Sequence, residues 1–200
     1  MKKRINVKGE AWLAQIIFDP LSYVHPRRLR LPVSLDTPRQ RAIVNRMLLG
    51  DLAEMSNRIE MAQQQLLRHW RDLPYICTLI GAQLMRQDLA WRGRLLTLPA
   101  PVLFFMSLPI RQAIGVTSEM SALPARCGSA DVLHQVQGAG VSCILDWQMK
   151  APSALLERMR LMFPPELDGH FESARKPPRA SELFLILQAI QYAKNHPNLV

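Results

Sequence analysis

Fifteen prolines divide this 200-residue chain into short segments, and most of the segments carry apolar residues at helical spacing. Proline lacks a backbone donor and clashes with the preceding turn, so a helix ends at or near the next proline. Between the prolines, apolar side chains recur every three or four residues, which is the period of one helix face. The pattern predicts an all-α fold of short, proline-punctuated helices. A length of 200 residues is enough for one compact domain over residues 1–200, with two small domains as the alternative.

Capping residues and apolar stripes place the expected helices. Asp36 or Thr37 caps one of them, with Pro38 in its first turn, and Asp72 and Pro74 begin another. Gly50 either separates two helices or is tolerated within one. Residues 131–137 are weakly helical, residues 141–147 fit a helix or a strand, and residues 122–129 and 173–179 are expected to be loops. The helices expected from these signals cover about 9–18, 37–50, 51–71, 74–93, 102–107, 110–118, 152–162 and 181–195.

The expected C-terminal helix, 181–195, is apolar on nearly every side. A helix that is apolar all round belongs in the middle of a hydrophobic core. This helix is therefore predicted to be buried, with Trp70 and the 74–91 helix packed near it. If its Phe184 is fully buried, truncation to alanine costs about 3–5 kcal/mol. The apolar residues of the helix are Leu183, Phe184, Leu185, Ile186, Leu187, Ala189, Ile190 and Tyr192.

Residues 16–23 read IIFDPLSY and predict a tight helix start. The carboxylate of Asp19 suits an N-cap, and Pro20 suits the first helical position, where its missing N–H needs no partner. Phe18 and Tyr23 have the spacing of a hydrophobic staple. We expect a short helix whose start is fixed by this cap and this staple. Replacing Asp19 by alanine should then lower the free energy of unfolding by about 1 kcal/mol, because the cap is lost.

The bend that follows carries a group of basic residues. Pro26 biases His25 away from helical geometry, so the helix ends there. Arg27, Arg28 and Arg30 are then expected to project beyond the bend, either as part of a partner-binding surface or beside a corner that only anchors the N-terminus. The candidate partner-binding residues are Tyr23, His25, Arg27, Arg28 and Arg30. The candidate structural residues are Phe18, Asp19, Pro20, Pro26, Trp70 and Pro74.

The positive charge of the chain is concentrated near its start. The net charge is +9, and residues 1–50 contribute +7 of it, with ten Lys or Arg against three acidic residues. Such a segment favours an acidic protein surface, anionic lipid or nucleic acid as a partner, unless it is only a solvated basic face. Nucleic-acid binding is the alternative function, because Arg39, Arg41 and Arg46 lie on the outer face of the 37–50 helix. Against it, no helix-turn-helix pattern is clear and aromatic residues do not interleave with the basic ones.

No motif for catalysis or metal binding is found. The sequence has no Gly-rich phosphate loop, HExxH, nucleophile elbow or pair of CxxC motifs. The spacings of Cys127, His134 and Cys143 fit no zinc site, and Cys77 lies in an apolar helix, where a small buried thiol is the usual case. We expect no enzyme activity, metal or cofactor. An odd number of separated cysteines indicates reduced thiols and a cytoplasmic location.

No membrane-spanning segment or signal peptide is expected either. The longest purely apolar runs are five residues each, far below the roughly 20 needed to span a bilayer. The charged start at residues 1–4 resembles that of a signal peptide, but polar residues break the apolar stretch that should follow.

Three blocks resemble one known family. They are residues 16–29 (IIFDPLSYVHPRRL), residues 66–99 with Trp70, Leu73-Pro74, Gly81 and the run RQDLA before Gly93, and finally LMFPP at 161–165 with QYAKNHPN at 191–198. In this order and spacing they resemble the OrgA/MxiK/SctK family, accessory proteins of bacterial type III secretion systems. Residues 30–65 and 100–150 match poorly.

The resemblance implies an all-helical, non-enzymatic adaptor of the sorting platform, which is the cytoplasmic assembly beneath the secretion needle complex. Family members join the cytoplasmic domain of an inner-membrane ring protein (SctD/PrgH-like) to the pod protein (SctQ/SpaO-like), which holds the ATPase hub. The resemblance therefore implies a location at the cytoplasmic face of the inner membrane, through protein contacts, and no nucleic-acid partner.

Overall fold

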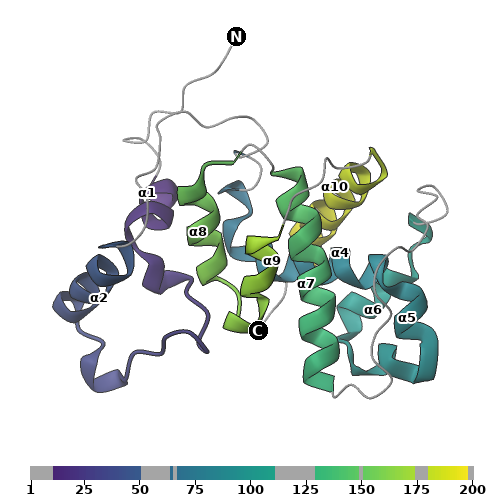
Figure 1. Ribbon diagram of the computed structural model, residues 1–200, viewed down its shortest axis with the longest axis horizontal. Helices are drawn as coiled ribbons and strands as arrows, with labels where there is room; N and C mark the ends of the chain where they lie inside the picture. The colour runs from purple at the N-terminus through teal and green to yellow at the C-terminus, as the bar shows by residue number, and fades with distance from the viewer. Residues whose placement is uncertain are drawn as a thin grey trace, which may run out of the picture. The chain divides into compact units, whose positions relative to one another are not determined.

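The computed structural model describes residues 11–50, 64, 67–110, 129–148, 151–173 and 180–197. Throughout these ranges the regular structure is α-helix or 3₁₀-helix, so the predicted all-α class is confirmed (Figure 1). The expected helices over 51–71 and 110–118 and the expected loops at 122–129 and 173–179 lie for the most part outside the described residues, and Cys127 lies outside them. None of the described helices is long and apolar enough to cross a membrane.

The contacts divide the chain into two compact units, 1–71 with 150–171 and 72–149 with 172–200. The single domain expected over 1–200 stays a prediction. The helices of the first unit are α1 (Ala11–Phe18), η2 (Pro20–Ser22), η3 (Val33–Leu35), α2 (Pro38–Gly50), α8 (Ser153–Leu161) and η7 (Pro165–Leu167), while η4 (Trp70–Asp72) and α9 (Asp168–Glu172) cross its boundaries. Those of the second are α4 (Leu73–Leu84), α5 (Arg86–Ala90), η5 (Trp91–Thr97), α6 (Ala100–Ser107), α7 (Ser129–Trp147) and α10 (Ala180–Asn195).

Several helix starts lie where capping and proline chemistry predict them. Thr37 caps α2 in a reciprocal arrangement with Gln40: the Gln40 N–H donates to Thr37 Oγ1 at 3.4 Å, and the Thr37 N–H donates to Gln40 Oε1 at 3.3 Å. Pro74 occupies the first turn of α4. Pro152 immediately precedes α8, and Pro164 immediately precedes η7. The starts at Thr37, Pro74 and Pro152 are local, and the sequence alone predicts them. The single helix expected over 74–93 is wrong, because α4, α5 and η5 divide this stretch.

The central helix of the second unit is α4, which contacts α6, α7 and α10. Ten of its twelve residues are buried. Its closest neighbour is α7, which runs unbroken from Ser129 to Trp147 and includes the stretch 141–147 whose type the sequence left open. Cys77 on α4 and Cys143 on α7 are both buried free thiols. Burial raises the pKa of both, to about 12 for Cys143, and the expected buried thiol at Cys77 is confirmed.

Two glycines set the spacing between α4 and α7. A Cβ atom at Gly81 would lie 1.7 Å from the carbonyl oxygen of Val136, and one at Gly140 would lie 1.8 Å from that of Cys77. Real Cβ contacts are never this short, so each helix approaches the backbone of the other where a side chain is missing. The close approach therefore requires a glycine in the middle of α7, although glycine normally weakens a helix.

The prediction that the C-terminal helix is buried on all sides is wrong. One side of α10 is buried, through Leu185, Ile186, Ala189 and Ala193, while Phe184 is 44% and Leu187 57% exposed. α10 contacts α4 and α7, which cover only one side of it. Although α10 has apolar residues on nearly every side, it does not lie at the centre of the hydrophobic core.

Because Phe184 is half-exposed, we expect Phe184→Ala to lower the free energy of unfolding by about 1 kcal/mol. The measurement is urea unfolding followed by circular dichroism, with the unaltered protein as reference. A loss of about 3–5 kcal/mol, the usual cost for a fully buried Phe, would instead show that this ring lies within a core.

Candidate partner-binding site

The predicted corner at residues 18–30 lies in the first unit and begins with a single 3₁₀ turn. After α1, the Asp19 N–H donates to Gln15 O at 2.9 Å, and the Tyr23 and Val24 N–H groups both donate to Pro20 O. The chain then turns again, as the Arg28 N–H donates to His25 O at 2.9 Å. The predicted short helix and bend are therefore present, but the side chains that hold them differ from the prediction.

Asp19 precedes the turn at the N-cap position, yet its side chain makes no capping hydrogen bond. Instead, Asn45 of α2 donates from Nδ2 to Asp19 Oδ1 at 2.6 Å, and its Oδ1 accepts from the Leu21 N–H at 2.9 Å. The side chain of Asn45, from another helix, thus provides the hydrogen-bond partners for the backbone N–H of Leu21 and the carboxylate of Asp19. The predicted cap is wrong, because Asn45 holds both groups.

The predicted staple between Phe18 and Tyr23 is also wrong. Phe18 is 64% exposed. Tyr23 turns inward, where its hydroxyl donates to Ile16 O at 2.8 Å and its ring meets the buried Trp70 edge-on, with centroids 5.5 Å apart. Burial raises the pKa of the Tyr23 phenol. Tyr23 therefore fixes the corner to Trp70, and its ring is mostly hidden from solvent.

His25 joins the corner to the end of α8. Its backbone N–H donates to Leu161 O at 2.8 Å, and its Nδ1 accepts from the Arg27 N–H at 3.1 Å. Pro26, next to it, is exposed at the bend. The half-buried imidazole is thus used, at least in part, to shape the turn.

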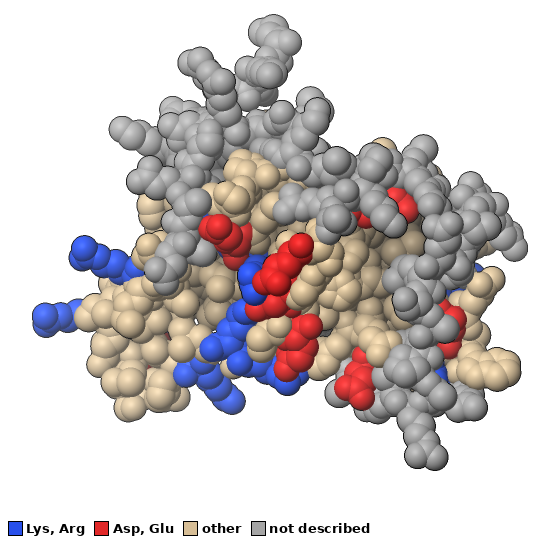
Figure 2. All heavy atoms as spheres, viewed as in Figure 1, with Lys and Arg blue, Asp and Glu red and all other residues tan. Residues whose placement is uncertain are grey.

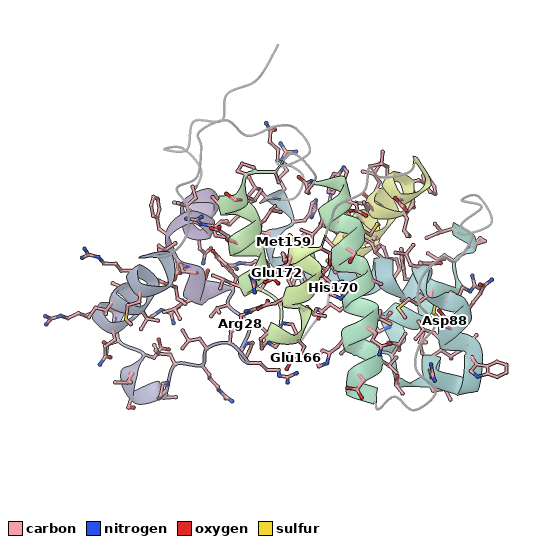
Figure 3. The ribbon with its side chains drawn as sticks, in the orientation of Figure 1. Arg28, Asp88, Met159, Glu166, His170 and Glu172 are labelled. Carbon is pink, nitrogen blue, oxygen red and sulfur yellow. The ribbon has the colours of Figure 1, made fainter. Side chains whose placement is uncertain are left out.

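Arg28 does not project into solvent, contrary to the prediction. Its Nε donates to Phe163 O at 2.6 Å, and its terminal nitrogens donate to Pro164 O and to the carboxylate of Asp168. The side chain of Arg28 is only 15% exposed. Figure 3 shows Arg28 directed toward the segment that carries Glu166. Arg28 therefore links the corner to the chain after α8.

Asp168 is shared between two arginines. Besides Arg28, it accepts from Arg160 Nη2 at 2.7 Å. Burial acts to raise the pKa of Asp168, but the hydrogen bonds from Arg160 and Arg28, together with their charges, lower it to about 2. The carboxylate therefore stays ionised over the physiological range and holds both arginines.

Arg27 and Arg30 form the exposed part of the corner. Arg27 Nη2 lies 2.5 Å from Glu166 Oε1, with both side chains about half exposed, at 51% and 43%. A pair this exposed contributes little to stability. Arg30 is exposed as well, and Figure 2 shows basic side chains beside acidic ones on this face. Of the five candidate partner-binding residues, these two are the ones open to a partner.

The three sequence blocks behind the family resemblance contribute to this one corner. Residues 16–29 form it, residues 161–165 accept hydrogen bonds from His25 and Arg28, and Trp70 packs on Tyr23. Sequence reasoning missed Asn45, Arg160, Glu166 and Asp168, which stabilise it. Asn45 and Asp168 lie 24 and 140 residues from the corner groups that they bind, and Arg160 acts on the corner through Asp168, so no local pattern signals them.

The corner presents positive charge on a defined backbone bend to another molecule. Within the described ranges, no group of three or more His, Cys, Asp or Glu side chains is arranged to hold a metal ion. What the corner presents is a rigid backbone bend with two accessible guanidinium groups, which can pair with carboxylates on another molecule.

Comparison with known proteins gives consistent matches. Residues 13–195 match the model of a family described as bacterial type III secretion apparatus protein (OrgA_MxiK). The chain is 33% identical over 191 residues to the "Oxygen-regulated invasion protein OrgA" of Salmonella typhimurium strains 14028s, SL1344 and LT2, covering 93% of this chain and 88% of each relative. No solved structure matches the chain significantly.

Proposed function

Because the chain belongs to the OrgA/MxiK family of bacterial type III secretion apparatus proteins, we propose that it is a non-enzymatic adaptor of the sorting platform. It joins the pod protein (SctQ/SpaO-like) to the cytoplasmic domain of the inner-membrane ring protein (SctD/PrgH-like). Under this proposal it works at the cytoplasmic face of the inner membrane, where protein contacts hold it.

The observation that supports this role most directly is that one corner arginine is bound within the fold while two others are exposed. Arg28 is used internally, through Phe163, Pro164 and Asp168. Arg27 and Arg30 remain accessible on a backbone whose shape is already determined. Binding to a preformed surface loses little conformational entropy, which favours binding in general. The two positive charges favour an acidic partner.

The structure also changes how the corner must be tested. Replacing Arg27 and Arg28 together by Glu, the variant that the sequence suggests, would disturb the fold, because Arg28 donates to two backbone carbonyls and a carboxylate. Arg27→Glu with Arg30→Glu changes exposed charges and removes the exposed pair between Arg27 and Glu166, which contributes little to stability. Arg27→Lys with Arg30→Lys is the matched control, since it keeps both charges at the same positions.

We expect R27E/R30E to slow association with at least one of the two apparatus proteins about tenfold, because like charges would then face each other. R27K/R30K should associate as the unaltered chain does, and both variants should keep its melting temperature. The measurement is biolayer interferometry with the purified pod protein and the purified cytoplasmic domain of the ring protein, at about 0.15 M salt.

Two results would count against these proposals. If the unaltered chain binds neither apparatus protein, or binds DNA with sequence specificity at this salt concentration, the adaptor role is overturned. If it binds both proteins and R27E/R30E associates with each at the unaltered rate, the corner is only an architectural bend.

A further inference from the structure

Helix α2 exposes an outer stripe in which arginines alternate with large apolar residues. The stripe consists of Arg39, Ile43, Arg46 and Met47, which share one face because Ile43 lies three or four residues from each of the other three. Ile43 is 53% and Met47 71% exposed, and both arginines are exposed. Figure 2 shows basic side chains extending into solvent from the surface at α2.

α2 itself is held firmly at several points. The Thr37 and Gln40 side chains cap its start, and Asn45 hydrogen-bonds to Asp19 and Leu21. Its inner side, with Val44 and Leu48, is half-buried. The outer stripe is therefore presented by an anchored helix.

The charge of α2 is of one sign. Residues 38–50 contain three arginines and no acidic residue. Arg41 is paired with Asp36, at 2.8 Å between Nη1 and Oδ1, whereas no ion pair of Arg39 or Arg46 is found among the described residues. Arginine and methionine are both enriched at the centres of protein interfaces. The stripe is therefore complementary to a surface that is both acidic and apolar.

We propose that this stripe docks an acidic amphipathic helix of a protein partner, with two apolar side chains against Ile43 and Met47 and a carboxylate against each of Arg39 and Arg46. This inference rests on the proposed adaptor role and adds a second contact surface to it. Arg39 and Arg46 are separated by two helical turns, about 10 Å at 1.5 Å per residue. The partner helix therefore carries its two acidic residues about that far apart, with one apolar residue between them and the second apolar residue beside the acidic residue that meets Arg46.

The arrangement favours a protein over a lipid or nucleic-acid partner. A helix that inserts into a membrane surface separates a broad apolar face from a basic one, whereas here the arginines and apolar residues share one narrow stripe. A phosphate backbone would place its charged oxygens against Ile43 and Met47. Those oxygens would lose water without gaining a hydrogen bond, which is unfavourable.

The test compares three variants of the full chain. R39E/R46E reverses the charges of the stripe, and Met47→Asp places a charge at one of its two apolar positions. Lys194→Glu is a control that reverses an exposed charge on α10. The probes are the purified pod protein, the purified cytoplasmic domain of the ring protein, phosphatidylglycerol/phosphatidylethanolamine vesicles and a DNA duplex. Association and dissociation rates are measured for each probe, with melting temperatures as the check on folding.

The proposal expects binding to one of the two proteins to be lost selectively. R39E/R46E should slow its association at least tenfold and remove most of the salt dependence, and Met47→Asp should speed its dissociation about tenfold. Lys194→Glu should bind that protein as the unaltered chain does.

Equal binding of R39E/R46E and the unaltered chain to both proteins would overturn the docking surface and leave the adaptor role standing. A loss confined to vesicles or DNA would also overturn it. If the unaltered chain binds neither protein, both proposals fail.

Discussion

Replacing Gly81 with alanine is expected to lower the free energy of unfolding by about 3 kcal/mol or more. The new methyl carbon would lie 1.7 Å from the carbonyl oxygen of Val136 and 2.7 Å from its carbonyl carbon. Those atoms belong to the backbone of α7, which cannot move aside as a flexible side chain can. The two helices would have to separate, and their separation would loosen the packing of the core around α4.

The measurement is urea unfolding monitored by circular dichroism, with Gly50→Ala as the control. No atom lies within 4 Å of a Cβ built on Gly50, so that variant should be neutral or gain up to about 1 kcal/mol from the better helix propensity of alanine. Gly140→Ala should be as damaging as Gly81→Ala, since its methyl carbon would lie 1.8 Å from Cys77 O.

The double variant Gly81→Ala/Gly140→Ala provides a further check. Both clashes arise at one helix crossing, so a single separation of α4 and α7 relieves both, and the double variant should lose less than the two single variants together. If Gly81→Ala were within about 0.5 kcal/mol of the unaltered protein, the close crossing described here would be wrong.

Arg28→Ala is expected to lower the free energy of unfolding by about 2 kcal/mol at neutral pH, because it removes charge-assisted hydrogen bonds from a mostly buried guanidinium. Phe163 O and Pro164 O lose a donor, and Asp168 keeps only Arg160 of its two arginines. Arg30→Ala is the matched control at an exposed site, with an expected change within about 0.5 kcal/mol.

The destabilisation by Arg28→Ala should depend on pH. The pKa of Asp168 is lowered from 3.8 to about 2 in the folded protein, so between these values the unfolded state binds more protons. The stabilising effect of this carboxylate is therefore present above about pH 4 and is lost as the pH falls toward 2. In Arg28→Ala the folded pKa of Asp168 moves back toward its usual value.

The difference between the two proteins should consequently shrink on acidification. Urea unfolding at pH 7, at pH 4 and at pH 2.5 measures it. A difference that stays constant from pH 7 to pH 2.5 would show that Arg28 stabilises the corner only through the two backbone carbonyls, without Asp168.

These two sites also separate stability from recognition. The Gly81 crossing and the Arg28 link are expected to act on folding, while Arg27, Arg30 and the α2 stripe are expected to act on binding with little effect on folding. A set of variants drawn from both groups should therefore fall into two classes, distinguished by melting temperature and by association rate.

The sequence by itself determined the helical class and many helix boundaries. Helical spacing, the Thr37 cap, Pro74 at the start of α4 and Pro152 before α8 each depend on residues within one or two turns. The bend after Tyr23 and the burial of Cys77 were predictable for the same reason. Such features depend on short-range sterics and hydrogen bonding, which a single sequence contains.

Only the tertiary structure decided what each side chain does. Arg28 and Arg30 look alike in sequence, but carbonyls and a carboxylate more than 130 residues away bind the first. Asp19 looks like a cap, but Asn45 takes that role. α10 appears central by composition, whereas α4 is central because other helices cover it on several sides. Gly140 looks like a weak point in a helix, but the backbone of α4 approaches so closely there that a side chain would not fit. In each case the deciding partner is distant in the chain, and only folding brings it within reach.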